Sequence, residues 1–483
     1  MTIKLNKIWQ WVGFALITIV LIIGNRQGVL ADVTPSYKNL QYPPLPEIVI
    51  PDYERYQLKN GMVVYLMEDH QLPLISGSAI VRTGSRFEPS NQVGLASLTG
   101  DLMRLGGTNN HTPDQLNSIL EQKAAAIETS FGTTSGSASF SSLSYDLETV
   151  FPLFAEVLKS PAFDNQQFEL QKTRVRGGIA RRNDNPGQIA RREFPKLIYG
   201  ENSPYGRTIE YETLNNIDRQ DLIDFYGKYV RPENIILGIV GDFQPEAMKA
   251  TLEKTFSDWQ VTTPSPNLVT TLPQQKNSSG IFIADQPQLT QSNILLGHLG
   301  GKLKDANYPT LSVINGVLNG FGGRLYNEIR SRQGLAYSVY GMWSANYDFP
   351  GVFIAGGQTK SETTGQFIKS TIAEIDRLRE DSITEDELNY AKDSILNSFV
   401  FQFQNPTQTL SRLMTYEYYD YPSDFIFNYQ KAVKNTTIND VLKVAQEYLT
   451  PDKIVTLIVG NQTVVKEQFK DFNQPINTVD ISI

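Results

Sequence analysis

Arg330 and Tyr337, seven positions apart, have side chains that suit the binding of an extended ligand. A guanidinium is a rigid fork of donors that pairs with carbonyl or carboxylate oxygens, and a phenol hydroxyl can donate one further hydrogen bond. Together they could converge on a single ligand. A plainer interpretation stays open: Arg330 complements the C-terminal end of a helix, and Tyr337 is an ordinary strand aromatic.

The stretch around this pair, 320–340, changes abruptly from helical to strand spacing. Leu325, Tyr326 and Ile329 recur at three- and four-residue intervals, which is typical of one helix face. Glycine follows the last turn, and 335–340 has the composition of a strand. The sequence therefore predicts a helix over 324–330 that carries Arg330, followed by a strand that carries Tyr337.

Composition narrows the class of protein. The chain has 483 residues, of which 40% are hydrophobic and 19% charged, so it is globular and long enough for two or more domains. A net charge of -8 with mixed signs argues against a nucleic-acid partner, because phosphate binding needs a concentrated basic face. Cysteine is absent, which excludes disulfides and thiolate chemistry.

The N-terminal residues have the pattern of a secretory signal. Lys4 and Lys7 precede an apolar run over 11–23, and Val29-Leu30-Ala31 offers small residues for cleavage. We expect a signal peptide over 1–31 and a Pro- and Tyr-rich linker over 32–50. The chain is then exported to the periplasm or another extracytoplasmic space; membrane association through an uncleaved segment stays open.

An internal repeat indicates a tandem duplication. A helix, a Pro-marked turn and a strand that ends in glycine occur twice, with Tyr229 and Pro232 matching Tyr448 and Pro451 at a constant offset. A Pro/Ser/Asn-rich stretch lies between the copies. We predict a first domain over 51–261, a linker over 262–280 and a second domain over 281–475.

Each domain alternates strand and helix patterns. In the first, strands flank an Asn60-Gly61 turn, another covers 74–82, and helices follow, one of them over 112–127. In the second, strands at 281–284, 291–297 and 352–356 alternate with helices such as 308–318. The predicted fold class is α+β, with a mainly antiparallel sheet covered by helices in each domain.

The motif at 322–339, GGRLYNEIRSRQGLAYSV, closely resembles the second-domain motif of the insulinase/pitrilysin (inverzincin) family of zinc peptidases. In that family an Arg and a Tyr seven residues apart contact the bound peptide, and Arg330 and Tyr337 match these positions. The resemblance covers roughly residues 50–470. It implies two homologous domains that face each other across a cleft.

The family's zinc-binding motif is degenerate in this chain. Its first domain carries H-x-x-E-H on a helix, with two zinc ligands and a glutamate that activates water. The matching positions here are Ser97, Gly100 and Asp101, and the position of the third ligand is Gly177. The only histidines are His70, His111 and His298, and none has a partner at ligand spacing. We therefore expect no metal and no catalytic residue within this chain.

Two further groups are candidate site residues. Arg86 and Glu88 lie in a turn that resembles the family's G-S-R-x-E turn, and both favour a structural role as ion-pairing groups. Tyr340, Trp343 and Tyr347 follow the Arg/Tyr motif; they could line an apolar cleft or belong to the core.

The resemblance extends to processing-peptidase-like heterodimers, in which one subunit carries H-x-x-E-H and the other supplies the Arg/Tyr pair. It implies that this chain is the non-catalytic, peptide-binding subunit, that zinc belongs to the partner, and that the substrate is an extended peptide. The competing hypothesis is an inactive insulinase-like scaffold or polypeptide-binding protein with no peptidase role.

Overall fold

The computed structural model describes residues 48–269, 271–469 and 476–483. The predicted signal peptide and most of the predicted 32–50 linker lie outside these residues. Among the residues described, a search for helices long and apolar enough to cross a membrane finds none.

The first half of the chain forms a six-stranded mixed sheet in the order β1-β2-β6-β3-β5-β4. The β2–β6 pair is parallel and the other pairs are antiparallel. The strands are β1 (Glu54–Gln57), β2 (Val63–Glu68), β3 (Leu74–Val81), β4 (Ala126–Phe131), β5 (Gly136–Leu143) and β6 (Ile235–Gly241). The helices are α2 (Leu95–Leu105), α3 (Pro113–Gln122), α4 (Leu147–Lys159), α5 (Asn165–Ala180), α6 (Pro186–Tyr199), α7 (Tyr211–Asn215), α8 (Arg219–Tyr229) and α9 (Pro245–Phe256).

The second half repeats this sheet, in the order β12-β7-β11-β8-β10-β9, so that β7, β11, β8, β10 and β9 take the places of β2, β6, β3, β5 and β4. Its strands are β7 (Gly280–Asp285), β8 (Gln291–Leu299), β9 (Ala336–Ser344), β10 (Val352–Lys360), β11 (Val455–Gly460) and β12 (Ile476–Thr478). Its helices are α10 (Tyr308–Leu318), α11 (Thr364–Glu380), α12 (Glu385–Phe399), α13 (Pro406–Tyr419), α14 (Phe425–Asn435), α15 (Ile438–Tyr448) and α16 (Gln462–Glu467). The duplication and the α+β fold class are confirmed.

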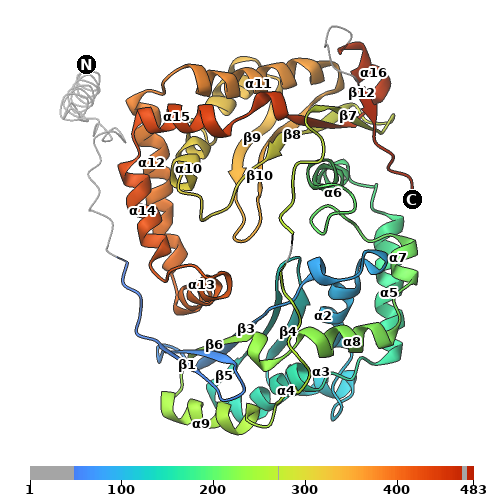
Figure 1. Cartoon of the computed structure of the whole chain (residues 1–483), viewed down its shortest axis with the longest axis vertical. Helices are drawn as coiled ribbons and strands as arrows, with labels where there is room; N and C mark the ends of the chain where they lie inside the picture. The colour runs from blue at the N-terminus through green and yellow to red at the C-terminus, as the bar shows by residue number, and fades with distance from the viewer. Residues whose placement is uncertain (1–47, 270, 470–475) are drawn as a thin grey trace, which may run out of the picture. The chain divides into compact units, whose positions relative to one another are not determined.

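Each sheet has its own hydrophobic core on the face that its helices cover (Figure 1). Alternate residues of β3 are buried, as expected for a strand with one face in a core. In the first half, the core packs β3 against α2, α4 and α8; in the second, it packs β8 against α10, α11 and α15. These two cores fix the backbone positions of the candidate site residues.

The opposite face of each sheet is partly covered by a helix from the other half. Leu410 and Met414 of α13 pack against Ile236 of the first sheet. In the same way, Ile189 and Phe194 of α6 pack against Leu457 and neighbouring strands of the second sheet. The two halves therefore exchange one helix each.

The helix predicted over 112–127 ends early. Thr112 caps α3, but the helix stops at Gln122, and Ile127 lies in β4. Ala124 has a φ of 46°, a left-handed conformation that breaks the helix before the strand begins. The strand predicted over 352–356 is also longer than expected, because it continues to Lys360.

Candidate functional site

Arg330 lies on a π-helical segment, η6 (Tyr326–Arg332), rather than on the predicted α-helix. Its guanidinium carbon lies 4.7 Å from the ring centre of Tyr326 and 4.7 Å from that of Tyr337. The cation is thus held between two aromatic faces, each of which attracts it. In the residues that the structure describes, Arg330 makes no hydrogen bond or ion pair, so the N–H edges of the guanidinium are available to a ligand.

The aromatic groups around Arg330 are exposed to an unusual degree. Tyr337 is 83% exposed and Phe321 is 80% exposed, and the Phe321 ring lies edge-on to Tyr326 at 5.1 Å. Tyr337 belongs to β9, which is an edge strand of the second sheet. Large apolar side chains grouped in this way on a surface are typical of a binding site.

The residues at the H-x-x-E-H positions lie on α2, next to β4. Ser97 lines a cavity, whereas Gly100 packs directly against the β4 backbone. A Cβ atom on Gly100 would lie 2.8 Å from the carbonyl carbon of Ser130 and still closer to the amide nitrogen of Phe131. The position of the family's glutamate therefore has no room for any side chain.

The other two positions also lack the chemistry of a zinc ligand set. Asp101 is half-buried, and burial raises the pKa of its carboxyl group above the ordinary value. Gly177 on α5 offers no donor, although a side chain there would meet open space. A search of the described residues for three or more His, Asp or Glu arranged around one metal position finds no such group. Serine, two glycines and one carboxylate do not fit a zinc ion, which takes three or four protein ligands.

A cavity of 530 Å³ lies at this degenerate position. Its wall combines apolar side chains, such as Val175 and Ile179, with Arg182, Arg207 and Glu88. The Glu88 side chain is 1% exposed, and burial raises its pKa to about 6, even though the backbone N–H of Ala96 donates a hydrogen bond to it. Of the predicted site residues, Ser97 and Glu88 line this cavity, whereas Arg330 and Tyr337 are not among its lining residues.

The residues of the turn at 83–88 are structural, but they do not pair with each other. Arg86 forms an ion pair with Asp348 of the second half. Glu88 accepts a hydrogen bond from α2, and one of its oxygens lies 3.8 Å from an Arg207 nitrogen. The Arg86–Asp348 ion pair joins the two halves of the chain, and the hydrogen bond accepted by Glu88 holds the start of α2.

The three aromatic residues after the motif have different positions. Trp343 is 5% exposed and belongs to the second core. Tyr347 stacks on Tyr419 of α13, with ring centres 4.7 Å apart. Tyr340 lines a small cavity beside Arg191 of α6, and burial raises the pKa of its hydroxyl. Trp343 is thus a core residue, Tyr347 packs against α13, and Tyr340 lines a cavity.

The histidines have structural partners. His70 pairs with Asp242, and His111 pairs with Glu156. His298 is buried, which lowers its pKa; its Nε2 accepts a hydrogen bond from the Thr450 backbone N–H. All three histidines therefore form polar contacts within the protein.

Sequence reasoning did not assign a role to Tyr326 or Phe321. Tyr326 precedes Arg330 by four residues, a spacing that places two side chains on one face of a helix, so the cation–π contact could have been predicted. Phe321 lies between glycines and had no such signal, because its ring contact depends on how the loop folds back.

Comparison with known proteins agrees with this geometry. Residues 64–212 match the family model described as "Insulinase (Peptidase family M16)". Residues 216–395 match "Peptidase M16 inactive domain". The chain belongs to the M16 peptidase family. The M16 models cover the degenerate zinc position and the Arg/Tyr motif respectively.

Curated relatives of this M16 chain carry different names. An uncharacterized zinc protease of Rickettsia felis is 23% identical over 350 residues, which is 71% of this chain and 82% of the relative. A protein of Helicobacter pylori named as the non-peptidase homolog YmxG is 24% identical over 391 residues, which is 79% of this chain and 88% of the relative. Relatives named as proteases and as non-peptidases thus both match the chain.

Solved structures support the fold. A peptidase M16 inactive domain from Pseudomonas fluorescens matches with a TM-score of 0.77 and 24% identity, over 85% of this chain and 98% of that one. A protease from Helicobacter pylori matches with a TM-score of 0.74 and 19% identity, over 85% of this chain and 100% of that one. The protein is thus an M16 homologue with a degenerate metal position in its first domain.

Proposed function

We propose that this M16 homologue is the non-catalytic, peptide-binding subunit of a heteromeric zinc metallopeptidase. In this proposal Arg330 and Tyr337 complete the active site of a homologous partner that carries H-x-x-E-H. The observation that carries the proposal is the Tyr326–Arg330–Tyr337 sandwich, in which the guanidinium lies between two rings beside the edge strand β9 and has no hydrogen-bond partner among the described residues.

The exposure of this group supports action on a second molecule. Tyr337 is 83% exposed on one side of Arg330, and Phe321, which contacts Tyr326 on the other side, is 80% exposed. Exposed aromatic side chains grouped in this way are typical of a surface that binds a partner. The cavity at the chain's own degenerate position is lined by residues other than those of the sandwich. Both features fit a site that is completed by a partner's surface rather than by the first domain of the same chain.

The two side chains would act differently on an extended peptide. Arg330 would donate paired hydrogen bonds to a carbonyl or carboxylate and so fix the register of the peptide. Tyr337 would donate its hydroxyl proton in a hydrogen bond near the scissile bond, where negative charge develops on the carbonyl oxygen. The partner's zinc would supply Lewis-acid chemistry. Tyr326 would keep the guanidinium in position before the peptide arrives.

Purification of the native complex tests the proposal. The tagged chain is isolated from its own cells under native conditions, and the co-purifying chains and the zinc content are measured by mass spectrometry. We expect a homologous chain with H-x-x-E-H and zinc in that chain. Tight, near-equimolar zinc in the isolated protein, with chelator-sensitive peptide hydrolysis, would contradict the proposal.

Export is part of the proposal. The basic residues, apolar run and small residues over 1–31 support a secretory signal, and the substrate is then an extracytoplasmic polypeptide. In the alternative, the segment is not cleaved and attaches the protein to the membrane.

Two observations favour a second function. The degenerate metal position and the name of the Helicobacter pylori relative both fit a scaffold or polypeptide-binding protein with no peptidase role. In that case the native complex contains no H-x-x-E-H chain, and substitution of Arg330 or Tyr337 affects polypeptide binding alone.

A further inference from the structure

Residues 476–483 lie along the second sheet and then reach the first half of the chain. Strand β12 pairs in parallel with β7, and the backbone N–H of Val479 donates to the Ile283 carbonyl at 2.8 Å. Beyond this point the segment runs past the α5–α6 connection. It thereby adds an outer strand to the sheet and spans two elements that are distant in sequence.

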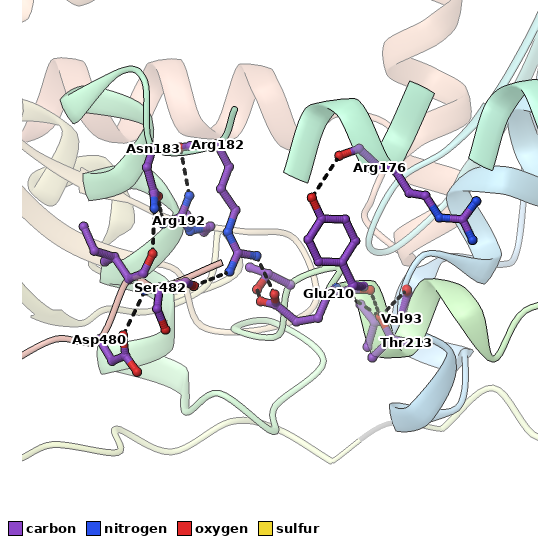
Figure 2. Close-up of polar contacts among 12 residues, drawn as sticks. Val93, Arg176, Arg182, Asn183, Arg192, Glu210, Thr213, Asp480 and Ser482 are labelled. Atoms are coloured by element: carbon purple, nitrogen blue, oxygen red, sulfur yellow. Dashed lines mark hydrogen bonds and ion pairs between the residues drawn. The ribbon is translucent and has the colours of Figure 1, made fainter. Parts of the chain in front are cut away.

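Two side chains of the α5–α6 connection hold the end of this segment by its main chain (Figure 2). Asn183 Nδ2 donates to the Ile481 carbonyl at 2.6 Å, and Arg182 Nη2 donates to the Ser482 carbonyl at 3.0 Å. Both acceptors are backbone oxygens, which every extended polypeptide presents. These hydrogen bonds therefore do not depend on the side chains of the bound segment.

The two donors are fixed by neighbours outside the segment. Arg192 donates to the Asn183 side-chain oxygen at 2.8 Å and to the Arg182 carbonyl at 2.9 Å. Arg182 is also paired with Glu210 on the opposite side (Figure 2). Arg182 and Asn183 are thus held in place by residues of the first half, and their positions do not depend on residues 476–483.

Three apolar side chains of the segment pack against the protein, and the first of them, Ile476, packs against the second core. Val479 and Ile481 are partly buried against the cluster formed by α6 and the second sheet, whereas Asn477, Thr478, Asp480 and Ser482 are exposed. From Thr478 to Ser482, exposed and partly buried residues alternate, which is the pattern of a strand with one face on the protein. Any extended peptide with apolar residues at two alternate positions would present the same face.

We propose that the edge of β7, together with Arg182 and Asn183, is a binding site for extended polypeptide, and that residues 476–483 occupy it as an internal ligand. An incoming peptide adds to the sheet edge by strand addition and displaces the segment. Its main-chain carbonyls are read by Asn183 and Arg182, and its alternate apolar side chains replace Val479 and Ile481. This site is separate from Arg330 and Tyr337, which lie at the other edge of the second sheet, so the inference does not depend on a peptidase partner.

Matched charge variants in the full chain test the proposal. The probe is a fluorescein-labelled peptide with the sequence of residues 476–483, and binding is followed by fluorescence anisotropy. Val479→Asp places a charge on the packed face and should release the internal segment, so the probe binds about tenfold more tightly than to the unchanged chain. Asn477→Asp adds the same charge at an exposed position and should leave binding unchanged. Adding Asn183→Ala to Val479→Asp should weaken binding about fivefold, the effect of one lost hydrogen bond.

Equal binding by the Val479→Asp and Asn477→Asp variants, or no binding by either, would overturn the proposal. A second probe, in which Val479 exchanges places with Asp480 and Ile481 with Ser482, should bind poorly because its apolar residues face solvent.

Hydrogen exchange on the unchanged chain covers the case in which Val479→Asp fails to fold. Saturating probe should make the amides of residues 476–483 exchange about tenfold faster, while those of β7 stay protected. Unchanged protection of 476–483 at saturating probe would show that the segment is not displaced, and the proposal would be wrong.

Discussion

Gly100→Ala tests whether the backbone of β4 excludes a side chain from the family's glutamate position. The matched control is Gly177→Ala, because both glycines lie inside helices and an added Cβ at 177 meets nothing within 4 Å. Alanine in place of a helical glycine favours folding by about 1 kcal/mol at either position. Any difference between the two variants therefore measures the contact with β4.

The geometry at Gly100 predicts a net loss of stability. The added methyl group would lie 2.8 Å from the Ser130 carbonyl carbon, and it meets backbone rather than the end of a flexible side chain. Overpacking of this kind costs about 1–3 kcal/mol, and the rigid neighbour favours the upper part of that range. We expect Gly100→Ala to lower the free energy of unfolding by about 1–2 kcal/mol and Gly177→Ala to raise it by about 0.5–1 kcal/mol.

The assay is urea unfolding, with the midpoint of the first transition compared across the unchanged chain and the two variants. A Gly100→Ala midpoint equal to or above that of Gly177→Ala would refute the steric argument. The same argument predicts that Ser97→His, Gly100→Glu and Asp101→His together do not restore zinc binding. Equilibrium dialysis against zinc measures this directly.

Further predictions concern a buried acid, the aromatic sandwich and the N-terminal segment. Burial raises the pKa of Glu88 from 4.5 to about 6, so the folded state binds this proton more tightly than the unfolded state does. The free energy of unfolding should therefore fall by about 2 kcal/mol as the pH rises through this window. Glu88→Gln should remove that fall in urea titrations at pH 4.5 and 6.5, and an unchanged pH dependence would contradict the burial argument. In an active complex, Tyr326→Leu should raise KM about two- to fivefold, because Arg330 loses one of the two rings that hold it. Tyr326→Phe keeps the ring and should leave KM unchanged. An equal change in KM for both variants would mean that the ring of Tyr326 does not position the cation. N-terminal mapping of native protein should give a mature chain that begins near Asp32, and an intact 11–23 segment in membranes would indicate an anchor instead.

Much of the fold could be predicted because its signals are local. The Asn60-Gly61 turn, the capping residue Thr112 and the repeated Pro232 and Pro451 turns each mark an element that the structure contains. The helix end at Gln122 could not be predicted, because it depends on the left-handed conformation of Ala124 rather than on a glycine or proline.

The two exchanged helices, α6 and α13, share a local sequence signal. Both helices begin with Asn-Pro-x-Gln, at Asn185 and Asn405, and each asparagine caps its helix. The repeat therefore extends over these helices. Each of these helices packs on the sheet of the other half. This packing depends on tertiary contacts and cannot be predicted from a local sequence pattern.

The candidate site could be predicted in part. The residues at the degenerate positions were identifiable by type, but the lack of space at Gly100 comes from the approach of α2 to β4. The spacing of Arg330 and Tyr337 was visible, whereas the π-helical turn that brings the guanidinium between two rings was not. Arg182 and Asn183 carried no signal, because the Ser482 and Ile481 carbonyls that they bind lie about 300 residues away in the sequence.

The central claim is that Arg330 and Tyr337 serve a partner's active site, and steady-state peptide hydrolysis by the native complex tests it most directly. Tyr337→Phe should lower kcat about a hundred- to a thousandfold, as expected for a lost donor to a developing oxyanion, while Arg330→Ala should act mainly by raising KM. Both variants should fold and associate normally, as checked by light scattering, because both side chains lie outside the core clusters. Full activity of both variants in an active complex would contradict the account and favour the scaffold function.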